Sequence, residues 1–365
     1  MAAILVIATH YGYVQDGWIA LEFFFVLSGF LITANLLADM DRALGEYLVR
    51  FYWRRVLRTF PAYFGFLLIC AAVYFCVRLP QGFLGVLPSL GTYWYNFKLL
   101  FGLFGFGRDE SSSVFEFGHL WSMSVEEQFY LVWPFLVFVL RGANLRRVII
   151  AIVVLVPLLR LATFGYLHLK GVGDYPTSLI FYFATPFHLD AFSVGAAIAC
   201  FRLTELELKP RWVFVGGGCV LLLGLVNMWI GQNLYMRPGV SFGYPIYLMQ
   251  NRQFLWAYSV IDALSAALIV SASQQNRLQR FCENRFLWHL GRISYGFYIV
   301  HMPILHLLKP FWPADQWSLK GVAFFVVFFA ITFCVAHLSY VCFERRFLLL
   351  KDYFGKRKAG LIAPE

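Results

Sequence analysis

Residues 8–37 read ATHYGYVQDGWIALEFFFVLSGFLITANLL, and they place ionisable groups at the mouth of an apolar run. His10 lies in a first hydrophobic segment, and Asp16 and Glu22 follow in or just after a short turn that contains glycine. Residues 23–37 are apolar enough to enter a membrane. Because ionisable groups at such a place are costly, they are read by default as functional. The stretch therefore predicts a membrane helix with a polar site at its start.

The composition indicates a polytopic membrane protein. Of the 365 residues, 60% are hydrophobic and only 14% are charged, whereas a soluble domain carries about 25% charged residues. The net charge of +10 could indicate a nucleic-acid partner, but an excess of Lys and Arg is also the ordinary mark of cytoplasmic loops. The seven cysteines form no CxxC pair and lack metal-ligand spacing, so we interpret them as buried thiols.

Hydropathy predicts an all-α, polytopic membrane fold of about ten transmembrane helices. The candidate spans are residues 1–14, 18–38, 60–78, 120–140, 147–166, 179–201, 212–230, 254–273, 287–308 and 321–343. If both termini face the cytoplasm, most Lys and Arg residues fall in inner loops, so we predict an N-in/C-in topology. A span needs about 20 apolar residues, but only nine residues precede His10, and we therefore expect the natural chain to begin earlier. We assign residues 1–350 to one transmembrane domain and residues 351–365 to a basic cytoplasmic tail.

His10 is the first candidate catalytic residue. A neutral imidazole can take a proton from a hydroxyl near neutral pH, and a neighbouring carboxylate can fix its tautomer. Two antiparallel helices joined by the glycine-containing turn would bring His10 and Glu22 to similar depth. The alternative is a core histidine that donates to a backbone carbonyl. Asp16 is more typical of a turn residue.

Three arginines stand at the cytoplasmic entrance of the third predicted span, in FYWRRVLRTFPAY (residues 51–63). Arg54 and Arg58 are four residues apart and share a helical face, with Arg55 beside them. The planar fork of arginine suits phosphate groups. The alternative is a positive-inside anchor against anionic lipid.

Residues 119–134, HLWSMSVEEQFYLVWP, place polar side chains at the start of a membrane helix. Ser122 or Ser124 could cap this helix, and an acidic residue in the first turn suits the helix dipole. These effects explain one acid, but they do not explain Glu126 and Glu127 together with a tyrosine that runs into the apolar region. We therefore predict a buried polar site here.

Two further segments carry polar residues inside apolar sequence. In FATPFHLDAFSVGAAIA (residues 183–199), the small residues predict tight helix packing, and Asp190 is most simply the structural partner of an arginine. In GRISYGFYIVHMP (residues 291–303), Tyr295 and His301 lie with a second tyrosine about one turn apart on one helical face. Either these rings stack in a core or the histidine lines an outer cavity.

Taken together, these segments resemble the membrane acyltransferase-3 family, the integral-membrane O-acyltransferases of bacteria. They occur in the family's order and cover nearly the whole chain. The most specific combination is VLSGFLIT (residues 26–33) with WSMSVEEQFYL (residues 121–131). The resemblance implies a multi-pass, ten-helix protein of the bacterial inner membrane. Its expected reaction moves an acyl group, usually acetyl, from cytoplasmic acyl-CoA to a hydroxyl of a carbohydrate acceptor.

The resemblance also assigns roles to single residues. His10 matches the family's catalytic histidine, and Glu22 matches its acidic partner. The residues for the acyl-CoA end match Arg54, Arg55 and Arg58. The residues expected to hold the acceptor are Trp121, Ser122, Ser124, Glu126, Glu127 and Tyr130, together with Tyr295 and His301. Family members tend to have arginine where this chain has His188.

The expected partners are an acyl-CoA donor, with acetyl-CoA as co-substrate, a carbohydrate or glycoside acceptor, and the lipid bilayer. We expect no nucleic acid, no metal and no permanently bound cofactor, and a homodimer is left open. His10 would act either as a general base or through an acyl-imidazole intermediate. The competing class is a transporter of a small molecule without acyl-transfer chemistry. It does not explain cytoplasmic arginines combined with a single histidine at mid-depth.

Overall fold

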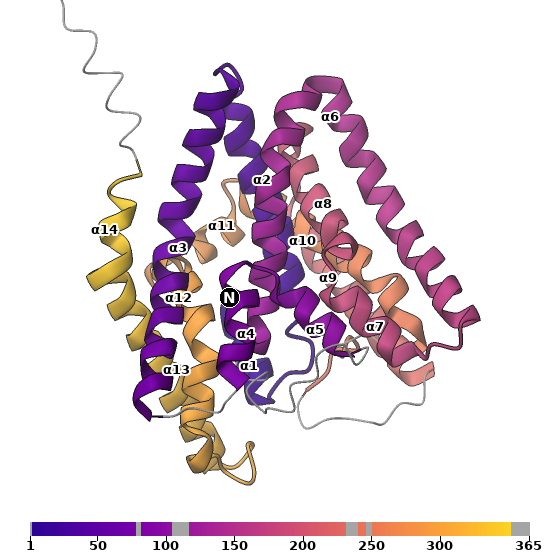
Figure 1. The fold of residues 1–365 in the computed structure, drawn as a ribbon. Helices are drawn as coiled ribbons and strands as arrows, with labels where there is room; N and C mark the ends of the chain where they lie inside the picture. The colour runs from indigo at the N-terminus through magenta and orange to yellow at the C-terminus, as the bar shows by residue number, and fades with distance from the viewer. Residues whose placement is uncertain (1, 78–81, 104–116, 231–239, 246–249, 352–365) are drawn as a thin grey trace, which may run out of the picture. The chain divides into compact units, whose positions relative to one another are not determined.

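The computed structural model describes residues 2–77, 82–103, 117–230, 240–245 and 250–351 (Figure 1). Over these residues the chain is helical and forms no strand, which confirms the predicted all-α class. Among them, five helices are long and apolar enough to cross a membrane, or six if one bent helix pair counts as a span. The number of ten spans and their orientation remain predictions. Most of the predicted basic tail lies outside the described residues.

The chain divides into two compact units. Unit 1 consists of Met1–Leu37, Thr92–Asp109 and His119–Trp288, and unit 2 consists of Ala38–Gly91, Glu110–Gly118 and His289–Glu365. The candidate site residues are distributed over both units, so each unit has its own set of candidate side chains.

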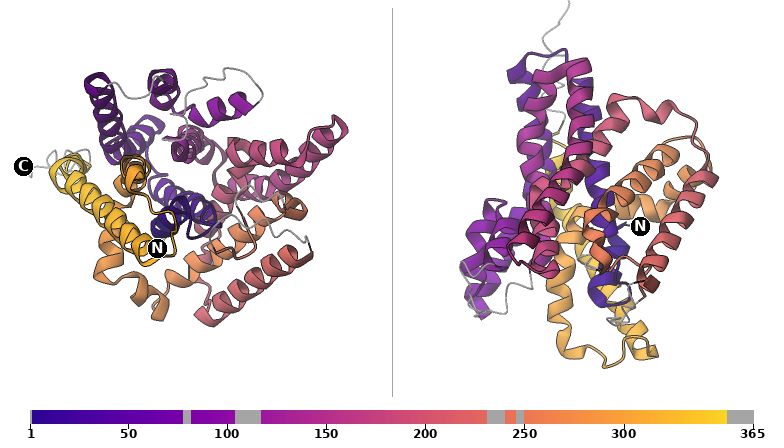
Figure 2. Two further views of the ribbon diagram at one scale, coloured as in Figure 1. Left: turned by 90° about the horizontal axis from the view of Figure 1, so that it is seen from below. Right: turned by 90° about the vertical axis from the view of Figure 1, so that its right-hand side faces the viewer.

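The helices of unit 1 are joined mostly by short 3-10 turns. They are α1 (Ala2–Tyr11), α2 (Ile19–Ala38), α5 (Tyr95–Leu103), η2 (Gly118–Leu120), α6 (Trp121–Leu169), α7 (Asp174–Phe183), η3 (Thr185–His188), α8 (Leu189–Cys200), η4 (Leu203–Glu205), α9 (Pro210–Ile230), η5 (Gln250–Leu255), α10 (Ala257–Ala272) and α11 (Arg277–Cys282). Within this unit, α8 packs against both α6 and α10, and α10 packs against α9 (Figures 1 and 2).

Helix α6 is broken where the sequence predicts a loop between two spans. Arg141 and Gly142 have φ angles of 34° and 50°, which interrupt the helix. The positive φ costs glycine little, because glycine has no Cβ to clash with the backbone. The 49-residue element therefore consists of two arms, which correspond to the predicted spans 120–140 and 147–166.

Two glycines allow α2 and α8 to touch backbone to backbone. A Cβ on Gly29 would lie 2.0 Å from the carbonyl oxygen of Phe192, and a Cβ on Gly195 would lie 1.9 Å from the carbonyl oxygen of Val26. Neither position has room for a side chain, so the tight packing predicted for residues 183–199 is confirmed. This close crossing places the start of α2 beside the segment that precedes α8.

The helices of unit 2 are α3 (Leu44–Val77), α4 (Gly82–Gly91), α12 (Arg285–Leu307), η6 (Lys309–Phe311), α13 (Leu319–Ser339), the π-helical turn η7 (Tyr340–Glu344) and α14 (Arg345–Leu348). Helix α3 packs against η7 and α14. It begins about four turns before the predicted span 60–78, so the arginines expected at a span entrance lie inside one continuous helix.

Large apolar side chains cover the outside of several helices. Helix α9, for example, buries only Val213 and Gly224, whereas Leu222 and Trp229 are 62% and 81% exposed. A helix that is apolar on all sides and still exposed suits a lipid environment. The same exposure corrects one prediction. The cysteines are free thiols, but of the seven only Cys200 is buried, and most of the others face outward.

Candidate active site

The carboxyl group of Glu22 lies at the start of α2 and contacts a buried histidine. Glu22 Oε1 lies 2.9 Å from Nδ1 of His188, the last residue of η3. The other ring nitrogen, Nε2, lies 2.9 Å from the carbonyl oxygen of Tyr182. Both ring nitrogens of this histidine are therefore in use. The pairing of Glu22 with His10 remains a prediction.

An ion pair lies next to this contact. Arg160 on α6 is completely buried, and its Nη2 lies 2.7 Å from Oδ1 of Asp190 on α8. The same nitrogen donates to the carbonyl oxygen of Phe187. The guanidinium group stands 4.8 Å from the centre of the Tyr258 ring. The prediction that Asp190 serves an arginine is confirmed.

Asp262 on α10 is a third buried acid that the sequence analysis missed. It is fully buried, and its carboxyl group lies within hydrogen-bonding reach of the Glu22 carboxyl group. The sequence feature that could have identified it is its position within the apolar run of residues 257–270. An acid inside a membrane segment costs free energy and usually has a function.

A polar network holds η3 against the neighbouring helices. Gln128 on α6 donates from Nε2 to Oδ1 of Asn96 on α5 at 3.0 Å, and the hydroxyl of Thr185 donates to its side-chain carbonyl oxygen. Asn96 in turn donates to the carbonyl oxygen of Phe183 at 3.1 Å. These bonds fix the segment that carries His188.

The structure brings His10 to the start of α6. Its ring centre is 6.4 Å from that of His119, which stands two residues before Trp121. The Trp121 ring packs 5.6 Å from the ring of His188. His10 is half-buried, whereas His119 and His188 are buried. Of these three histidines, His10 is therefore the most accessible to a substrate.

The two most specific motifs meet through Ser28. The Ser28 hydroxyl donates to Glu126 Oε1 at 2.7 Å, and the Tyr130 hydroxyl donates to the Ser28 oxygen at 3.1 Å. Glu126 and Glu127 are half-buried. The predicted polar region thus exists as a hydrogen-bonded group that includes Ser28, which the sequence analysis did not select.

The expected serine cap of α6 is wrong. The N-cap position is Leu120, and no side chain caps the helix there. Ser122 instead donates back to the carbonyl oxygen of His119 at 3.3 Å, and Ser124 is completely buried. The preceding turn η2 continues directly into α6, so the helix begins without the extended residue that a serine cap requires.

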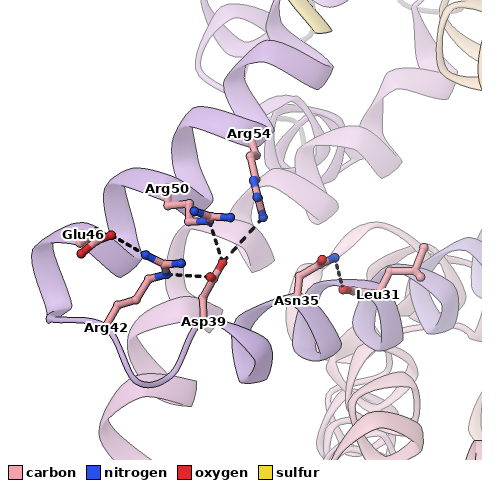
Figure 3. Close-up of polar contacts among 7 residues, drawn as sticks. All are labelled: Leu31, Asn35, Asp39, Arg42, Glu46, Arg50 and Arg54. Atoms are coloured by element: carbon pink, nitrogen blue, oxygen red, sulfur yellow. Dashed lines mark hydrogen bonds and ion pairs between the residues drawn. The ribbon is translucent and has the colours of Figure 1, made fainter. Parts of the chain in front are cut away.

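In unit 2, one aspartate forms ion pairs with three arginines (Figure 3). The Asp39 carboxylate lies 2.8 Å from Nε of Arg42, 3.1 Å from Nε of Arg50 and 3.7 Å from Nη1 of Arg54. Arg42 also pairs with Glu46. Only Arg54 of this group was a predicted site residue. The aspartate was missed because nothing in its own sequence neighbourhood indicates three partners.

The other two predicted arginines have different surroundings. Arg55 stands 5.9 Å from the centre of the Phe51 ring. Arg58 lies near enough to Glu344 for electrostatic attraction, and Glu344 also accepts a hydrogen bond from the Ser339 hydroxyl at 2.8 Å. Glu344 ends the π-helical turn η7, a type of distortion that is frequent at functional sites.

His301 on α12 belongs to the interior of unit 2. It is completely buried, and its Nδ1 lies 2.5 Å from the carbonyl oxygen of Tyr298, one turn earlier. The two rings are 5.5 Å apart. Of the two alternatives for this segment, these contacts match the stacked core. Tyr295 lies on the same helix and is half-buried.

Asp16 is a structural residue of the turn between α1 and α2. Its carboxylate accepts from the backbone N–H groups of Phe242 and Tyr244 at 2.5 and 2.9 Å and from the Ser241 hydroxyl at 3.1 Å. Burial raises the pKa of Asp16, and these hydrogen bonds offset part of the rise. The interpretation of Asp16 as a turn residue, outside the catalytic set, agrees with these contacts.

The long apolar helices and the buried ionisable side chains of unit 1 are typical of a membrane protein. The model of the family described as "Acyltransferase domain" matches residues 1–341. The chain therefore belongs to this family of membrane acyltransferases, and the resemblance carried by its motifs is confirmed.

Curated relatives match most of this chain. It is 27% identical over 354 residues to "Peptidoglycan O-acetyltransferase OatA" of Listeria monocytogenes, which covers 93% of this chain and 53% of the relative. It is 24% identical over 343 residues to "O-acetyltransferase OatA" of Staphylococcus aureus, with 90% and 52% covered. The chain thus spans about half the length of these relatives. No solved structure matches the chain.

Proposed function

We propose that the protein is a membrane O-acetyltransferase that uses acyl-CoA to acylate a hydroxyl of a surface or exported polysaccharide. The observation that carries the proposal is the family match over residues 1–341, because it spans the motifs in which all candidate site residues lie. The relative named as a peptidoglycan O-acetyltransferase supports acetyl as the acyl group and a cell-wall glycan as the acceptor class.

His10 is the proposed base. Both ring nitrogens of His188 already have partners, and that side chain is completely buried, so it could accept a substrate proton only by giving up a contact. The His10 side chain is half-buried and can meet a substrate. Glu22 stays in the proposal as the acidic partner of His10.

The reaction transfers the acyl carbon from sulfur to oxygen. The hydroxyl oxygen of the acceptor attacks the thioester carbonyl, the carbon–sulfur bond breaks, and an ester and a thiol result. His10 takes the hydroxyl proton and returns it to the leaving sulfur. In the alternative path, the His10 nitrogen attacks the thioester carbonyl first, the carbon–sulfur bond breaks, and the thiol leaves with a proton. The acceptor hydroxyl then attacks the acyl-imidazole, the carbon–nitrogen bond breaks, and the hydroxyl proton passes to the freed imidazole.

The arginines of unit 2 are the proposed site for the phosphate groups of the donor. Arg54, Arg55 and Arg58 supply forked donors that suit phosphate oxygens. Asp39 and Glu46 balance two of the three arginine charges, so the group formed by Arg42, Arg50 and Arg54 keeps one positive charge for an anion.

The acceptor is proposed to meet the start of α6. Glu126 and Glu127 are half-buried and can accept hydrogen bonds from sugar hydroxyls, and Tyr130 is linked to Glu126 through Ser28. The remaining proposed contacts are Trp121, Ser122, Ser124, Tyr295 and His301. The burial of Ser124 and His301 makes the two glutamates the stronger candidates for direct contact.

We propose ten spans with both termini on the cytoplasmic side of the bacterial inner membrane. Support comes from the helices themselves, when the two arms of α6 are counted separately and α7 with α8 is counted once. Adding α1, α10 and α12 to α2, α3, α9 and α13 then reaches the predicted number. The arginine-rich part of α3 would face the cytoplasm.

The test is acyl transfer by the purified full chain in lipid nanodiscs, with labelled acetyl-CoA and a peptidoglycan disaccharide as the acceptor. General base catalysis contributes roughly 10² to 10⁴ in rate, so His10→Ala should lose transfer by at least about 10²-fold. The matched control is His168→Ala, which removes an exposed histidine stacked on Phe164 in the same unit. Unchanged transfer in His10→Ala contradicts the mechanism.

The same preparation separates the two functional classes. An acyltransferase consumes acetyl-CoA and yields free thiol, whereas a transporter of a small molecule leaves the thioester intact. Membership of an acyltransferase family does not favour the transporter. Absence of thiol release with every carbohydrate acceptor and with water would remove the proposed function.

A further inference from the structure

The buried centre of unit 1 holds more acids than bases. Glu22, Asp190 and Asp262 are each at most 2% exposed, and Arg160 and His188 are completely buried. These side chains come from α2, α8, α10, α6 and η3. With all three acids ionised and a neutral imidazole, the group would carry two uncompensated negative charges. Such charges are too costly to keep in an apolar interior.

The contacts of His188 require the first neutralising proton. Nε2 faces the Tyr182 carbonyl oxygen, which can only accept, so Nε2 carries a hydrogen. A neutral imidazole would then present a lone pair at Nδ1 to the oxygen of Glu22, 2.9 Å away. Two lone pairs do not bind each other. The contact therefore holds a proton, on the nitrogen or on the oxygen.

The contact between Glu22 and Asp262 requires the second proton. Within the described part of the chain, no donor reaches either carboxyl oxygen of Asp262 or Oε2 of Glu22. The two carboxyl groups are nevertheless within hydrogen-bonding reach of each other. Two carboxyl groups in this arrangement share one proton, because both cannot be ionised at such a distance.

The hydrogen-bond argument and the charge balance thus give the same number of bound protons. One proton between His188 and Glu22 and one between Glu22 and Asp262 cancel the two excess negative charges. Arg160 and Asp190 already form a neutral pair at 2.7 Å. The remaining titratable group that faces the site is Tyr258 of α10, whose hydroxyl is buried without a partner in the described residues.

We propose that Glu22, His188 and Asp262 form a buried site that binds two protons in the folded protein at neutral pH. The ligand is the proton itself, and the site makes Asp262 and His188 positioning residues for the Glu22 carboxyl group. The inference rests on the contacts of unit 1 and does not require acyl transfer.

The direct test is infrared difference spectroscopy of the full chain in nanodiscs, without substrate, in H₂O and D₂O. A shared proton gives the carbonyl stretching band of a protonated carboxyl group. Asp262→Asn should weaken or shift this band, because the amide replaces the proton shared by the two carboxyl groups. Glu207→Gln is the matched control and should leave the band unchanged, since Glu207 is an exposed acid outside the buried group. A band that is unchanged in Asp262→Asn, or that changes in Glu207→Gln, overturns the proposal.

Folding gives a second measurement. A folded state that holds extra protons loses stability as the pH rises, because the unfolded chain releases them more readily. The unfolding temperature of the wild type should therefore fall as the pH rises above the range in which an unfolded carboxyl group titrates, and that of Asp262→Asn should fall less. Equal slopes for the two proteins would contradict a proton between Glu22 and Asp262. A variant that fails to fold is replaced by Asp262→Glu, which should retain the band.

Discussion

Arg160 in unit 1 and Arg54 in unit 2 show two uses of the same side chain. Arg160 is 0% exposed and has an aspartate of its own at 2.7 Å. The Arg54 side chain is 27% exposed and shares Asp39, at 3.7 Å, with two other arginines. The first arrangement is closed and electrically balanced. The second is open to solvent and keeps excess positive charge.

This difference separates structural from ligand-binding charge. In the buried group of unit 1, three acids face one arginine, and bound protons supply the missing positive charge. In unit 2, arginines outnumber the acids, and an anionic group such as a phosphate would complete the balance. Substitutions that remove one partner in each region should therefore act on different quantities, stability in unit 1 and donor binding in unit 2.

The largest effect is expected for Asp190→Ala. It leaves Arg160 charged and buried without its partner, and breaking a buried ion pair in this way costs about 3–5 kcal/mol. We expect the folded fraction to fall sharply in a denaturant titration of the purified protein in detergent. The companion variant replaces both residues, Arg160→Met with Asp190→Leu. It should recover much of the loss, because a well-packed apolar pair can substitute for a buried ion pair.

A loss below about 1 kcal/mol for Asp190→Ala would contradict the comparison, because that is the range of an exposed pair. The same result would indicate that water reaches Arg160 in solution. Hydrogen exchange at the start of α8 would then show where the water enters.

The sequence was sufficient to predict the structural features that depend on a local pattern of residues. The small residues of residues 183–199 predicted close packing, and Gly195 indeed meets the backbone of α2. The break at Arg141 and Gly142 fell between two predicted spans because charge interrupts the apolar run there. The start of α3 was missed because its first turns are helical but consist largely of polar residues. Hydropathy detects only the apolar part of this helix.

The pairings within the site depend on contacts between distant segments. Glu22 and His188 are 166 residues apart along the chain, so no spacing rule could pair them. Asp262 gave a signal by its presence in an apolar run, but its partner follows only from the packing of α10 in unit 1. His10 and Arg54 were selected by their motifs, and their proposed roles still require measurement.

An intermediate effect is expected for Arg54→Gln. A hydrogen bond to a charged group contributes about 1.5–3 kcal/mol, which corresponds to roughly tenfold to 150-fold weaker binding of coenzyme A. Isothermal titration calorimetry with coenzyme A measures this change. Stability should be nearly unaffected, because Arg54 has access to solvent.

Arg54→Lys makes this prediction more specific, because it keeps the positive charge and removes the planar guanidinium group that can donate two hydrogen bonds to one phosphate. Its affinity should lie between those of the wild type and Arg54→Gln. Arg141→Gln serves as the control, because that exposed arginine stacks on Phe138 in unit 1. Equal affinity of all four proteins for coenzyme A would remove Arg54 from the donor site.

The smallest overall effect is expected for Asp39→Asn. Its arginine partners are 21–28% exposed, so water replaces much of the lost attraction, and the cost should stay below about 1 kcal/mol. With one negative charge removed, coenzyme A should bind slightly more tightly at low salt and lose affinity more steeply as salt is added. Calorimetry at two salt concentrations and a denaturant titration measure both quantities. A stability loss as large as that of Asp190→Ala would mean that Asp39 holds unit 2 together, and the arginine group would then be structural as Arg160 is.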